Sequence, residues 1–372
     1  MHTFEVIPVV GKGLLNEFLH FPWKVYRDDP NWVPPLLIQQ KEMFNEKRFP
    51  FHFHSRVQPF LCKDSTGKTV GRICAVHNRR HLDFHRDGRG FFGFFESLDD
   101  QNIANALFRA ASQWLKEKGC TYIRGPANFS TNEECALLVE GFDSPPVIMM
   151  PYNPRYYIAL LENAGFSKAM DLYAYLGTVR GFPARYKEAL TLLKRRYNAR
   201  VRPLDFKKIR EEIELTFSIY NSSWEKNWGF IPMTEEEFLY IAKDFTKIAD
   251  HSLILILEVG GRPVGFSIAL PDLNVAFKQM NGRILPLGVF KFFYYKRKIK
   301  LLRIPAMGIL EEYRGIGLDS MLYLETALRA ADKGYNSGEF SWVLETNRKM
   351  NIASEKMGAK RYKTYRFYER KL

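Results

Sequence analysis

The chain has 372 residues, of which 46% are hydrophobic and 26% charged, and it carries a formal net charge of +14 with a pI of about 9.4. This composition excludes a disordered or collagen-like chain, and the length favours two domains of about 180 residues each. The positive charge favours an anionic partner, such as a nucleic acid, an anionic cosubstrate, an acidic carrier protein or a membrane surface, without choosing among them.

The cysteines and the apolar runs of the sequence indicate the cellular compartment of the protein. The four cysteines have neither metal-binding nor disulfide spacing, so we expect buried thiols in a reducing compartment. The first residues, MHTFEVIPVVGKG, lack the layout of a signal peptide. No apolar run reaches the ~18 residues expected of a transmembrane helix. The sequence therefore predicts a cytoplasmic protein.

Two segments of the chain repeat one pattern. Residues 67–75 (GKTVGRICA) and 261–269 (GRPVGFSIA) share Gly-basic-x-Val-Gly-x-x-x-Ala, and each follows an extended apolar run. Alternating β-forming residues around a glycine turn predict an antiparallel hairpin in both places. The match continues through a strand that ends in an acid (Glu96, Glu311) and an amphipathic helix that ends at Lys-Gly.

Both copies therefore follow the order β-β-β-α-β-α-β, with extra chain at 135–155 in the first copy and at 271–300 in the second. The sequence predicts an α/β (α+β) fold of two repeats, each a mixed, mostly antiparallel sheet flanked by helices. We place the two domains at residues 1–190 and 191–372, joined through a helical stretch at 183–197.

The most informative local pattern is ILEEYRGIGLDSMLYLETAL at 309–328. A strand ends, a turn with Gly315 and Gly317 follows, and an amphipathic helix begins. Such a turn presents backbone N–H groups at a helix N-terminus, where the helix dipole favours an anion. Glycine also lets a ligand approach the backbone closely, and Arg314 adds a charge. The pattern predicts a pyrophosphate site, although many strand–helix connections need glycine only to turn.

This segment resembles the acyl-CoA motif of the GNAT-type N-acetyltransferase superfamily, [Gln/Arg]-x-x-Gly-x-[Gly/Ala]. Arg314 and Gly317 match the motif, whereas Asp319 stands where the family has Gly or Ala. The resemblance implies acetyl-CoA or another acyl-CoA as cosubstrate, with its pantetheine paired to the fourth strand. The residues that it implies for CoA binding are Ile309, Leu310, Arg314, Gly315, Ile316, Gly317, Leu318, Asp319 and Asn347.

The resemblance also implies the catalytic groups. A carboxylate or a water near the end of the fourth strand is the usual base in this family, which makes Glu311 or Glu312 a candidate. The alternative is that both are solvated residues. Ser354 stands where the family often has a tyrosine acid, and a serine is a poor proton donor to a thiolate.

The first copy lacks the glycine turn and carries Asp99 and Asp100 there instead, so we expect no CoA site in it. It keeps a polar loop at 125–134, at the end of a strand. The hypothesis is that this loop and an aromatic residue of the second copy bind the acceptor, whereas turn chemistry and core packing are the plainer interpretations. The candidate acceptor-binding residues are Asn128, Ser130, Asn132, Glu133 and Trp224.

Two further stretches are ambiguous. Histidines 77, 81 and 85 have four-residue spacing, but the stretch is basic and punctuated by glycine, which favours a loop over a metal site, and we expect no metal. Residues 273–310 contain no acid, and an aromatic-basic run within 283–303 suits an anionic membrane surface, an acidic carrier protein or RNA. Its alternative is an inserted helix whose aromatic residues pack on the sheet.

Together these patterns predict an acyl-CoA-dependent N-acyltransferase that acts on a small-molecule or lipid-like amine. One alternative is an enzyme similar to the Fem-type aminoacyl transferases, which pair two GNAT-like units and use aminoacyl-tRNA. The glycine turn suits CoA better than a nucleic acid. A second alternative is a binding protein of this fold without catalytic activity.

Overall fold

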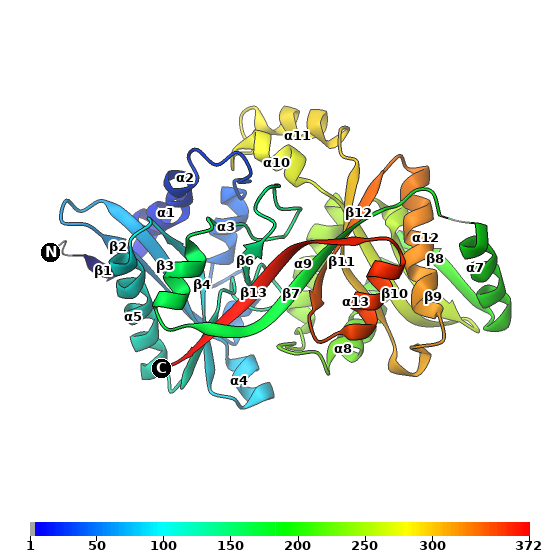
Figure 1. Ribbon diagram of the computed structural model, residues 1–372, viewed down its shortest axis with the longest axis horizontal. Helices are drawn as coiled ribbons and strands as arrows, with labels where there is room; N and C mark the ends of the chain where they lie inside the picture. The colour runs from blue at the N-terminus through cyan, green and yellow to red at the C-terminus, as the bar shows by residue number, and fades with distance from the viewer. Residues whose placement is uncertain (1–3, 183) are drawn as a thin grey trace. The chain divides into compact units, whose positions relative to one another are not determined.

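The computed structural model describes residues 4–182 and 184–372, which form two compact units (Figure 1). Unit 1 comprises Met1–Leu172, Ala276–Tyr294 and Lys363–Leu372, and unit 2 comprises Tyr173–Val275 and Tyr295–Tyr362. The compact units thus interleave along the chain. The predicted boundary at residue 190 separates the two duplicated copies, whereas the compact units are defined by contacts between residues. The boundary between the copies therefore stays a prediction.

Unit 1 is built on a sheet in the order β1-β2-β3-β4-β5-β13, with β6 on β13. Only the β4–β5 pair in this sheet is parallel. The core lies between the sheet and the long helix α5. The elements up to β7 are β1 Glu5–Pro8, α1 Gly11–His20, α2 Pro22–Val25, α3 Leu37–Met43, the 3-10 turn η1 Pro50–Phe53, β2 Arg56–Lys63, β3 Thr69–His77, α4 Arg79–His85, β4 Arg89–Ser97, α5 Gln101–Glu117, β5 Tyr122–Gly125, β6 Leu137–Glu140, α6 Tyr157–Asn163 and β7 Ser167–Thr178.

Unit 2 has the corresponding sheet β8-β9-β10-β11-β12, in which only the β11–β12 pair is parallel. Its core lies between this sheet and helices α7 and α12. The remaining elements of the chain are α7 Ala184–Arg196, β8 Ala199–Pro203, η2 Phe206–Lys208, α8 Ile209–Trp224, α9 Glu235–Ile248, η3 His251–Leu253, β9 Ile254–Val259, β10 Arg262–Pro271, α10 Asn274–Met280, α11 Gly288–Lys296, β11 Leu301–Ile309, η4 Glu311–Tyr313, α12 Leu318–Asp332, β12 Ser337–Leu344, α13 Arg348–Lys356 and β13 Lys360–Lys371.

The predicted fold class and the repeated order of elements are confirmed. The hairpin β2–β3 corresponds to β9–β10, and β4-α5-β5-α6-β7 corresponds to β11-α12-β12-α13-β13. The copies also share their first strand and helix, β1-α1 and β8-α8, which the sequence comparison did not find. We therefore use "first copy" for β1 to β7 and "second copy" for β8 to β13.

The shared Val-Gly dipeptide has a packing reason in both copies. A Cβ on Gly71 would lie 2.8 Å from a methyl group of Leu107 in α5. A Cβ on Gly265 would lie 2.9 Å from the carbonyl oxygen of Gly308 and 3.3 Å from Leu322 in α12. Real contacts of this kind are longer, so any larger residue would push the central helix off the hairpin.

The prediction of a loop around the three histidines is wrong. Residues Arg79–His85 form α4, which starts because Asn78 caps it by accepting a hydrogen bond from the His81 N–H at 3.1 Å. His81 is buried against Phe91, and burial lowers the pKa of its imidazole to about 4. Among residues 4–182 and 184–372, no group of three or more His, Cys, Asp or Glu side chains is arranged to hold a metal ion.

Within the same described part of the chain, no helix combines the length and the apolar character needed to cross a bilayer. The four cysteines are all buried. The insertion at 271–300 forms the short helices α10 and α11, and the predicted helix at 183–197 is present as α7.

Candidate active site

The parallel strands β11 and β12 separate before they end. Their pairing runs from Leu301 opposite Ser337 to Ile304 opposite Phe340, and no pairing between them follows among the described residues. Nevertheless β11 continues to Ile309 and β12 to Leu344. We call the residues after Ile304 and after Phe340 the strand split. Backbone N–H and C=O groups at such a split suit pairing with an extended ligand.

The glycine turn, residues 314–318, connects β11 through η4 to α12. Gly315 and Gly317 have positive φ values of 76° and 91°, and Gly317 is the N-cap of α12. No side chain of the described residues caps this helix, so its first N–H groups remain available. A Cβ on Gly315 would meet nothing within 4 Å, and one on Gly317 would meet only Leu193 at 3.4 Å. The turn is open enough for an anion at the positive end of the helix.

Arg314 holds this turn to the rest of unit 2. Its Nε donates a hydrogen bond to the Ile309 carbonyl oxygen at 3.0 Å, and its Nη2 donates to the Ser223 carbonyl oxygen at 2.5 Å. The guanidinium thus joins the end of β11 to the end of α8. Its predicted contact with a phosphate stays a prediction.

Two buried polar groups near the strand split lack a hydrogen-bond partner among the described residues. They are the Ser223 hydroxyl on α8 and the Trp342 indole N–H on β12. Ser223 lies against β11, because a Cβ placed on Gly308 would be 3.0 Å from its Oγ. A buried polar group left unsatisfied costs about 1–3 kcal/mol, so both groups suit a polar ligand or a water at the split. No motif in the sequence marked either residue.

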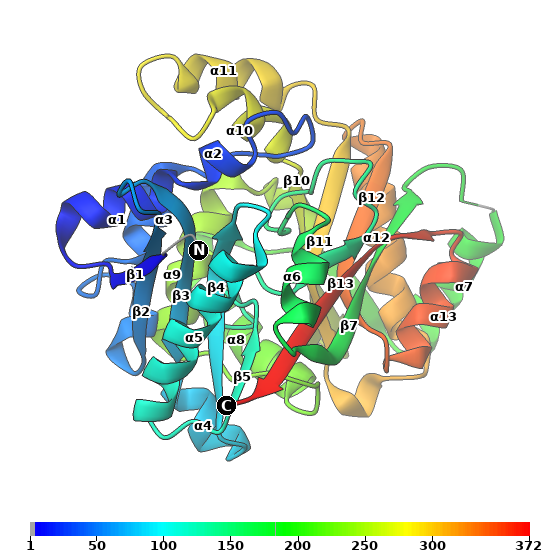
Figure 2. The same cartoon turned by 60° about the vertical axis from the view of Figure 1, so that its left-hand side comes forward.

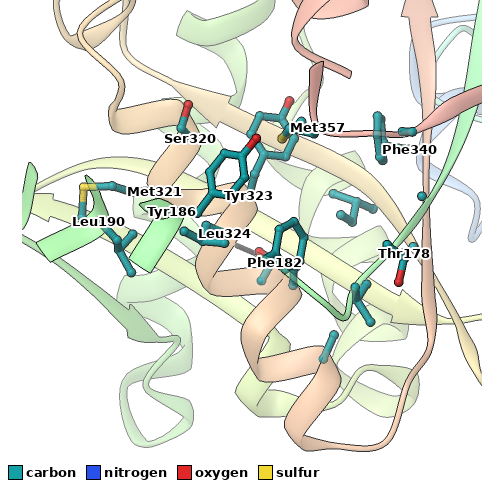
Figure 3. Close-up of a pocket in the computed structure, with 18 of the residues that line it drawn as sticks. Thr178, Phe182, Tyr186, Leu190, Ser320, Met321, Tyr323, Leu324, Phe340 and Met357 are labelled. Carbon is teal, nitrogen blue, oxygen red and sulfur yellow. The ribbon is translucent and has the colours of Figure 1, made fainter. Parts of the chain in front are cut away.

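An apolar cavity of about 140 Å³ lies beside the strand split, between α7 and α12 (Figure 3). Leu302, Ile304, Gly338 and Phe340 contribute its sheet side, so the cavity ends at the last paired residues of β11 and β12. The helix side is formed by Tyr186, Ala189, Leu190 and Leu193 of α7 and by Ser320, Met321, Tyr323, Leu324, Thr326, Ala327 and Ala330 of α12. The lining is completed by Gly177, Thr178, Val179, Phe182, Met357 and Ala359. Sequence reasoning missed this cavity because it treated α7 only as a connector.

The two candidate bases lie on the surface. Both Glu311 carboxylate oxygens accept hydrogen bonds from the Lys226 ammonium at 2.8 Å, which lowers the pKa of that carboxyl. Glu312 forms an exposed ion pair with Arg262 at 3.4 Å. Neither contact assigns a catalytic role, and the role of either glutamate stays a prediction.

The candidates downstream of β12 make contacts within α13. Asn347 is the N-cap of this helix, where its Oδ1 accepts a hydrogen bond from the Met350 N–H at 3.2 Å. The buried Ser354 hydroxyl donates to the Met350 carbonyl oxygen at 2.8 Å. Tyr323 of α12 is the nearby phenol, and it donates to the Met350 sulfur at 2.8 Å. Burial raises the pKa of Tyr323 further above its usual range.

The polar loop of the first copy is held by hydrogen bonds to its own surroundings. The Asn128 Oδ1 accepts from the Phe94 N–H at 2.7 Å, and the Ser130 N–H donates to Glu133 at 3.0 Å. The Asn132 N–H donates to the Ser130 hydroxyl at 3.1 Å. These bonds account for the residue types by turn chemistry, as in the plainer interpretation. A role for this loop in acceptor binding stays a prediction.

Among the candidate acceptor-binding residues, Trp224 is the one that belongs to the second copy, which contains the strand split. It ends α8 directly after Ser223, and its ring packs edge-on against Tyr220 at 4.2 Å between centroids. It also packs against Phe266 of β10, the residue paired with Gly308. In unit 2 the structure thus gathers Ile309, Leu310, Ser223, Trp224 and the glycine turn around one end of β11.

These features define the class of protein. A mostly antiparallel sheet, one parallel pair that separates at its end, and a glycine turn into the next helix form the GNAT acyltransferase fold, here present twice. The solved tandem GNAT protein from the clavulanic acid biosynthesis pathway matches 99% of this chain and 98% of its own, with a TM-score of 0.57 and 12% identity. A GCN5-related N-acetyltransferase from Sphaerobacter thermophilus matches 99% of this chain and 95% of its own, with a TM-score of 0.57 and 11% identity.

Two curated proteins are similar over almost the whole chain. Bacterial ceramide synthase from Caulobacter vibrioides is 36% identical over 376 residues, 99% of this chain and 97% of that protein. Protein YghO from Escherichia coli K12 is 35% identical over 371 residues, 98% of this chain and 94% of that protein. No protein-family model matches the sequence. The chain belongs to the family of bacterial ceramide synthase and YghO, and it is an acyltransferase of the tandem GNAT fold.

Proposed function

We propose that the second copy binds a fatty acyl-CoA and transfers its acyl group to the amine of a long-chain amino alcohol. The observation that carries this proposal is the strand split beside the open glycine turn. The turn offers N–H groups to the pyrophosphate, and the exposed edge of β11 offers backbone groups to the pantetheine amides. Ser223 and Trp342 are the side chains best placed to satisfy further polar atoms there.

The reaction that this site suits is a direct transfer. The neutral amine attacks the thioester carbonyl carbon, a C–N bond forms, and the C–S bond breaks as CoA leaves as a thiolate. The amine nitrogen releases one proton to a base or to water, and the thiolate receives one. Backbone N–H groups at the split would stabilise the negative oxygen of the tetrahedral intermediate. Ser354 is a weak candidate for the acid because its hydroxyl already donates within α13.

The apolar cavity supports a long acyl chain over an acetyl group. Its lining has few polar atoms, and it adjoins the closed end of the strand split, where a thioester paired along β11 would arrive. An alkyl chain that leaves water gains about 0.8 kcal/mol for each buried methylene. An acetyl group would leave the cavity unused.

The acceptor class is supported by a relative. Bacterial ceramide synthase is similar to this chain over nearly the full length of both proteins. A ceramide is by definition the amide of a fatty acid with a long-chain amino alcohol, so the same bond is the one that we propose here. The indole of Trp224 and the apolar residues around it would contact the acceptor next to β11.

The test is an assay of the purified full chain with acetyl-, octanoyl- and palmitoyl-CoA and with sphinganine as acceptor. We expect an amide product by mass spectrometry and at least tenfold higher kcat/KM with palmitoyl-CoA than with acetyl-CoA. Ala327→Phe should remove that preference by filling the cavity. Ala331→Phe, one helical turn further along α12 and outside the lining, is the matched control. CoA binding without any amide product would favour the binding-protein alternative.

The aminoacyl-tRNA alternative has its own outcome in this assay. Transfer from a charged tRNA, together with no binding of CoA, would replace our proposal by a Fem-type reaction. The open glycine turn supports CoA, because its size and its place at a helix N-terminus suit a pyrophosphate.

A further inference from the structure

An exposed apolar surface lies on the insertion between β10 and β11. Fourteen large hydrophobic side chains are prominently exposed among the described residues, and five of them fall within residues 285–294. These five are Leu285, Leu287, Phe290, Phe293 and Tyr294, with exposed fractions of 74%, 63%, 73%, 61% and 58%. Water-exposed residues of this size are normally scattered, so a cluster this dense marks a surface that binds something.

Basic side chains surround this apolar cluster. The exposed cations of the insertion and of the chain that continues it are Arg283, Lys291, Lys296, Arg297, Lys298 and Lys300. No acidic residue occurs between Asp272 and Glu311. The surface therefore combines bulky apolar groups with a high density of positive charge.

The part of the insertion that carries the five apolar side chains, Ala276–Tyr294, belongs to unit 1 and is anchored there by hydrogen bonds. The Trp23 indole N–H donates a hydrogen bond to the Asn281 side chain at 2.8 Å, and the Leu37 N–H donates to the Gly282 carbonyl oxygen at 3.0 Å. The rings of Phe277 and Phe292 stack at 6.3 Å, which joins α10 to α11. Figures 1 and 2 both show these two helices side by side.

We infer that this surface, residues 283–300, docks the protein on an anionic lipid bilayer. Phe, Leu and Tyr can enter the boundary between headgroups and acyl chains, while the neighbouring Lys and Arg remain at the phosphates. A nucleic acid would match the charge but would leave Leu285, Leu287 and Phe290 in water. The exposure and charge stand independently of the proposed reaction, although a bilayer is also where a long-chain amine would be found.

The experiment is flotation of the full chain with vesicles of phosphatidylcholine alone or of phosphatidylcholine with phosphatidylglycerol. We expect binding to the anionic vesicles that weakens as salt is raised. Reversing three charges with Lys296→Glu, Arg297→Glu and Lys298→Glu should weaken that binding at least a hundredfold. Phe290→Ser with Phe293→Ser, which leaves the charge unchanged, should weaken it by at least tenfold.

A matched control changes the net charge equally on another exposed face. Arg109→Glu and Lys116→Glu on α5, with Lys118→Glu at its C-cap, should leave vesicle binding within threefold of wild type. Wild-type protein that ignores anionic vesicles overturns the inference, and so does a control that loses as much binding as the α11 variant. Binding to RNA that is lost in the α11 variant, without any vesicle binding, would assign the surface to nucleic acid instead. Failure of amide formation leaves the flotation result intact, so the two proposals are tested separately.

Discussion

The two copies differ most at the place where their parallel strands separate. In the first copy β4 and β5 pair from Arg89 opposite Tyr122 to Phe91 opposite Arg124. The chain after β5 then folds back, so that the Ala127 N–H donates to the Phe92 carbonyl oxygen at 2.7 Å, and Asn128 accepts from Phe94. In the second copy the corresponding separation after Ile304 is the open strand split. The first copy thus has its own backbone bonded to β4 where the second copy has the open strand split.

The helix that follows these strands, α5 in the first copy and α12 in the second, also has an occupied N-terminus in the first copy and an open one in the second. In the first copy Asp100 caps α5 by accepting a hydrogen bond from the Asn102 N–H at 2.8 Å. In the second copy Gly317 occupies the N-cap of α12 without a side-chain cap. A carboxylate at the N-cap would repel a phosphate there, whereas the carboxylate of the second copy, Asp319, lies after the N-cap in the first turn of α12. The two copies thus differ at one strand end and at one helix cap, while each keeps a hydrophobic core.

The largest effect is expected from a substitution that blocks the open N-terminus of α12 in the second copy, because this would remove the main difference between the copies. We expect one CoA per chain by isothermal titration. Gly317→Glu should weaken CoA binding at least a hundredfold, because it places a carboxylate and a side chain at the open N-terminus of α12. A stoichiometry of two would mean that the first copy also binds.

The control for this variant is Gly119→Glu. Gly119 has a similarly positive φ of 82° and nothing within 4 Å of its would-be Cβ, so the backbone strain is matched. The Gly119→Glu variant should melt at a temperature close to that of the Gly317→Glu variant, and it should bind CoA with the affinity of the wild type. If both variants lose CoA binding equally, strain and not charge explains the loss.

The acids that the sequence repeat aligned, Glu96 and Glu311, are not at matching positions in the structure. Glu96 lies in β4 opposite Arg72, the corresponding position of β11 is Gly308, and Glu311 follows β11 in η4. Glu96 is partly buried, accepts hydrogen bonds from Tyr26 at 2.9 Å and Tyr157 at 2.7 Å, and lies 3.6 Å from the buried Arg72 guanidinium. Burial raises the pKa of the Glu96 carboxyl. Glu96→Gln should destabilise the protein by about 3–5 kcal/mol in chemical denaturation, because Arg72 would keep a buried charge without its partner. A loss below 1 kcal/mol would contradict this account.

A smaller effect on stability is expected at Asn128, which holds the chain after β5 of the first copy against β4. Asn128→Ala should lower the free energy of unfolding by about 1–3 kcal/mol, since the Phe94 N–H loses its acceptor. Asn128→Asp keeps a side-chain oxygen there and should recover most of the stability. CoA affinity should stay within twofold of wild type for both. If the loop holds the acceptor instead, Asn128→Ala would raise the acceptor KM without changing the melting temperature.

The sequence predicted the repeat because its hairpin glycines and helix ends are side-chain signals. The glycines at 71 and 265 lie close both to the central helix and to a carbonyl oxygen of the next strand, so the same residue type recurs in both copies. The strand split could not be predicted, because the end of a backbone ladder has no side-chain signature. The cavity could not be predicted for a related reason: its lining residues come from five separated stretches of the chain that look like ordinary core.

Individual site residues show the same limit. Asn347 matches the family position, yet the structure shows a helix cap, a role that any Asn before a helix can fill. The loop prediction at α4 failed because the cap at Asn78 and the burial of His81 outweighed a basic, glycine-flanked composition. Ser223 was missed because a serine near a helix end is unremarkable until its neighbours are known.

The smallest effect is expected at Glu311, the exposed acid at the start of η4. Because Lys226 holds its pKa below the usual range, Glu311 is ionised at neutral pH but is a weak base. We expect Glu311→Gln to change kcat less than threefold and the free energy of unfolding by less than about 0.5 kcal/mol, as for other surface ion pairs.

Lys226→Met provides the decisive comparison, because it should let the pKa of Glu311 rise. If Glu311 were the base, the acid limb of the kcat–pH profile would then move to higher pH, since the required ionised form would be lost earlier as the pH falls. An unmoved limb in Lys226→Met, with near-normal kcat in Glu311→Gln, would leave water or Glu312 to accept the proton. A hundredfold fall in kcat for Glu311→Gln, together with the shifted limb, would assign the base to Glu311.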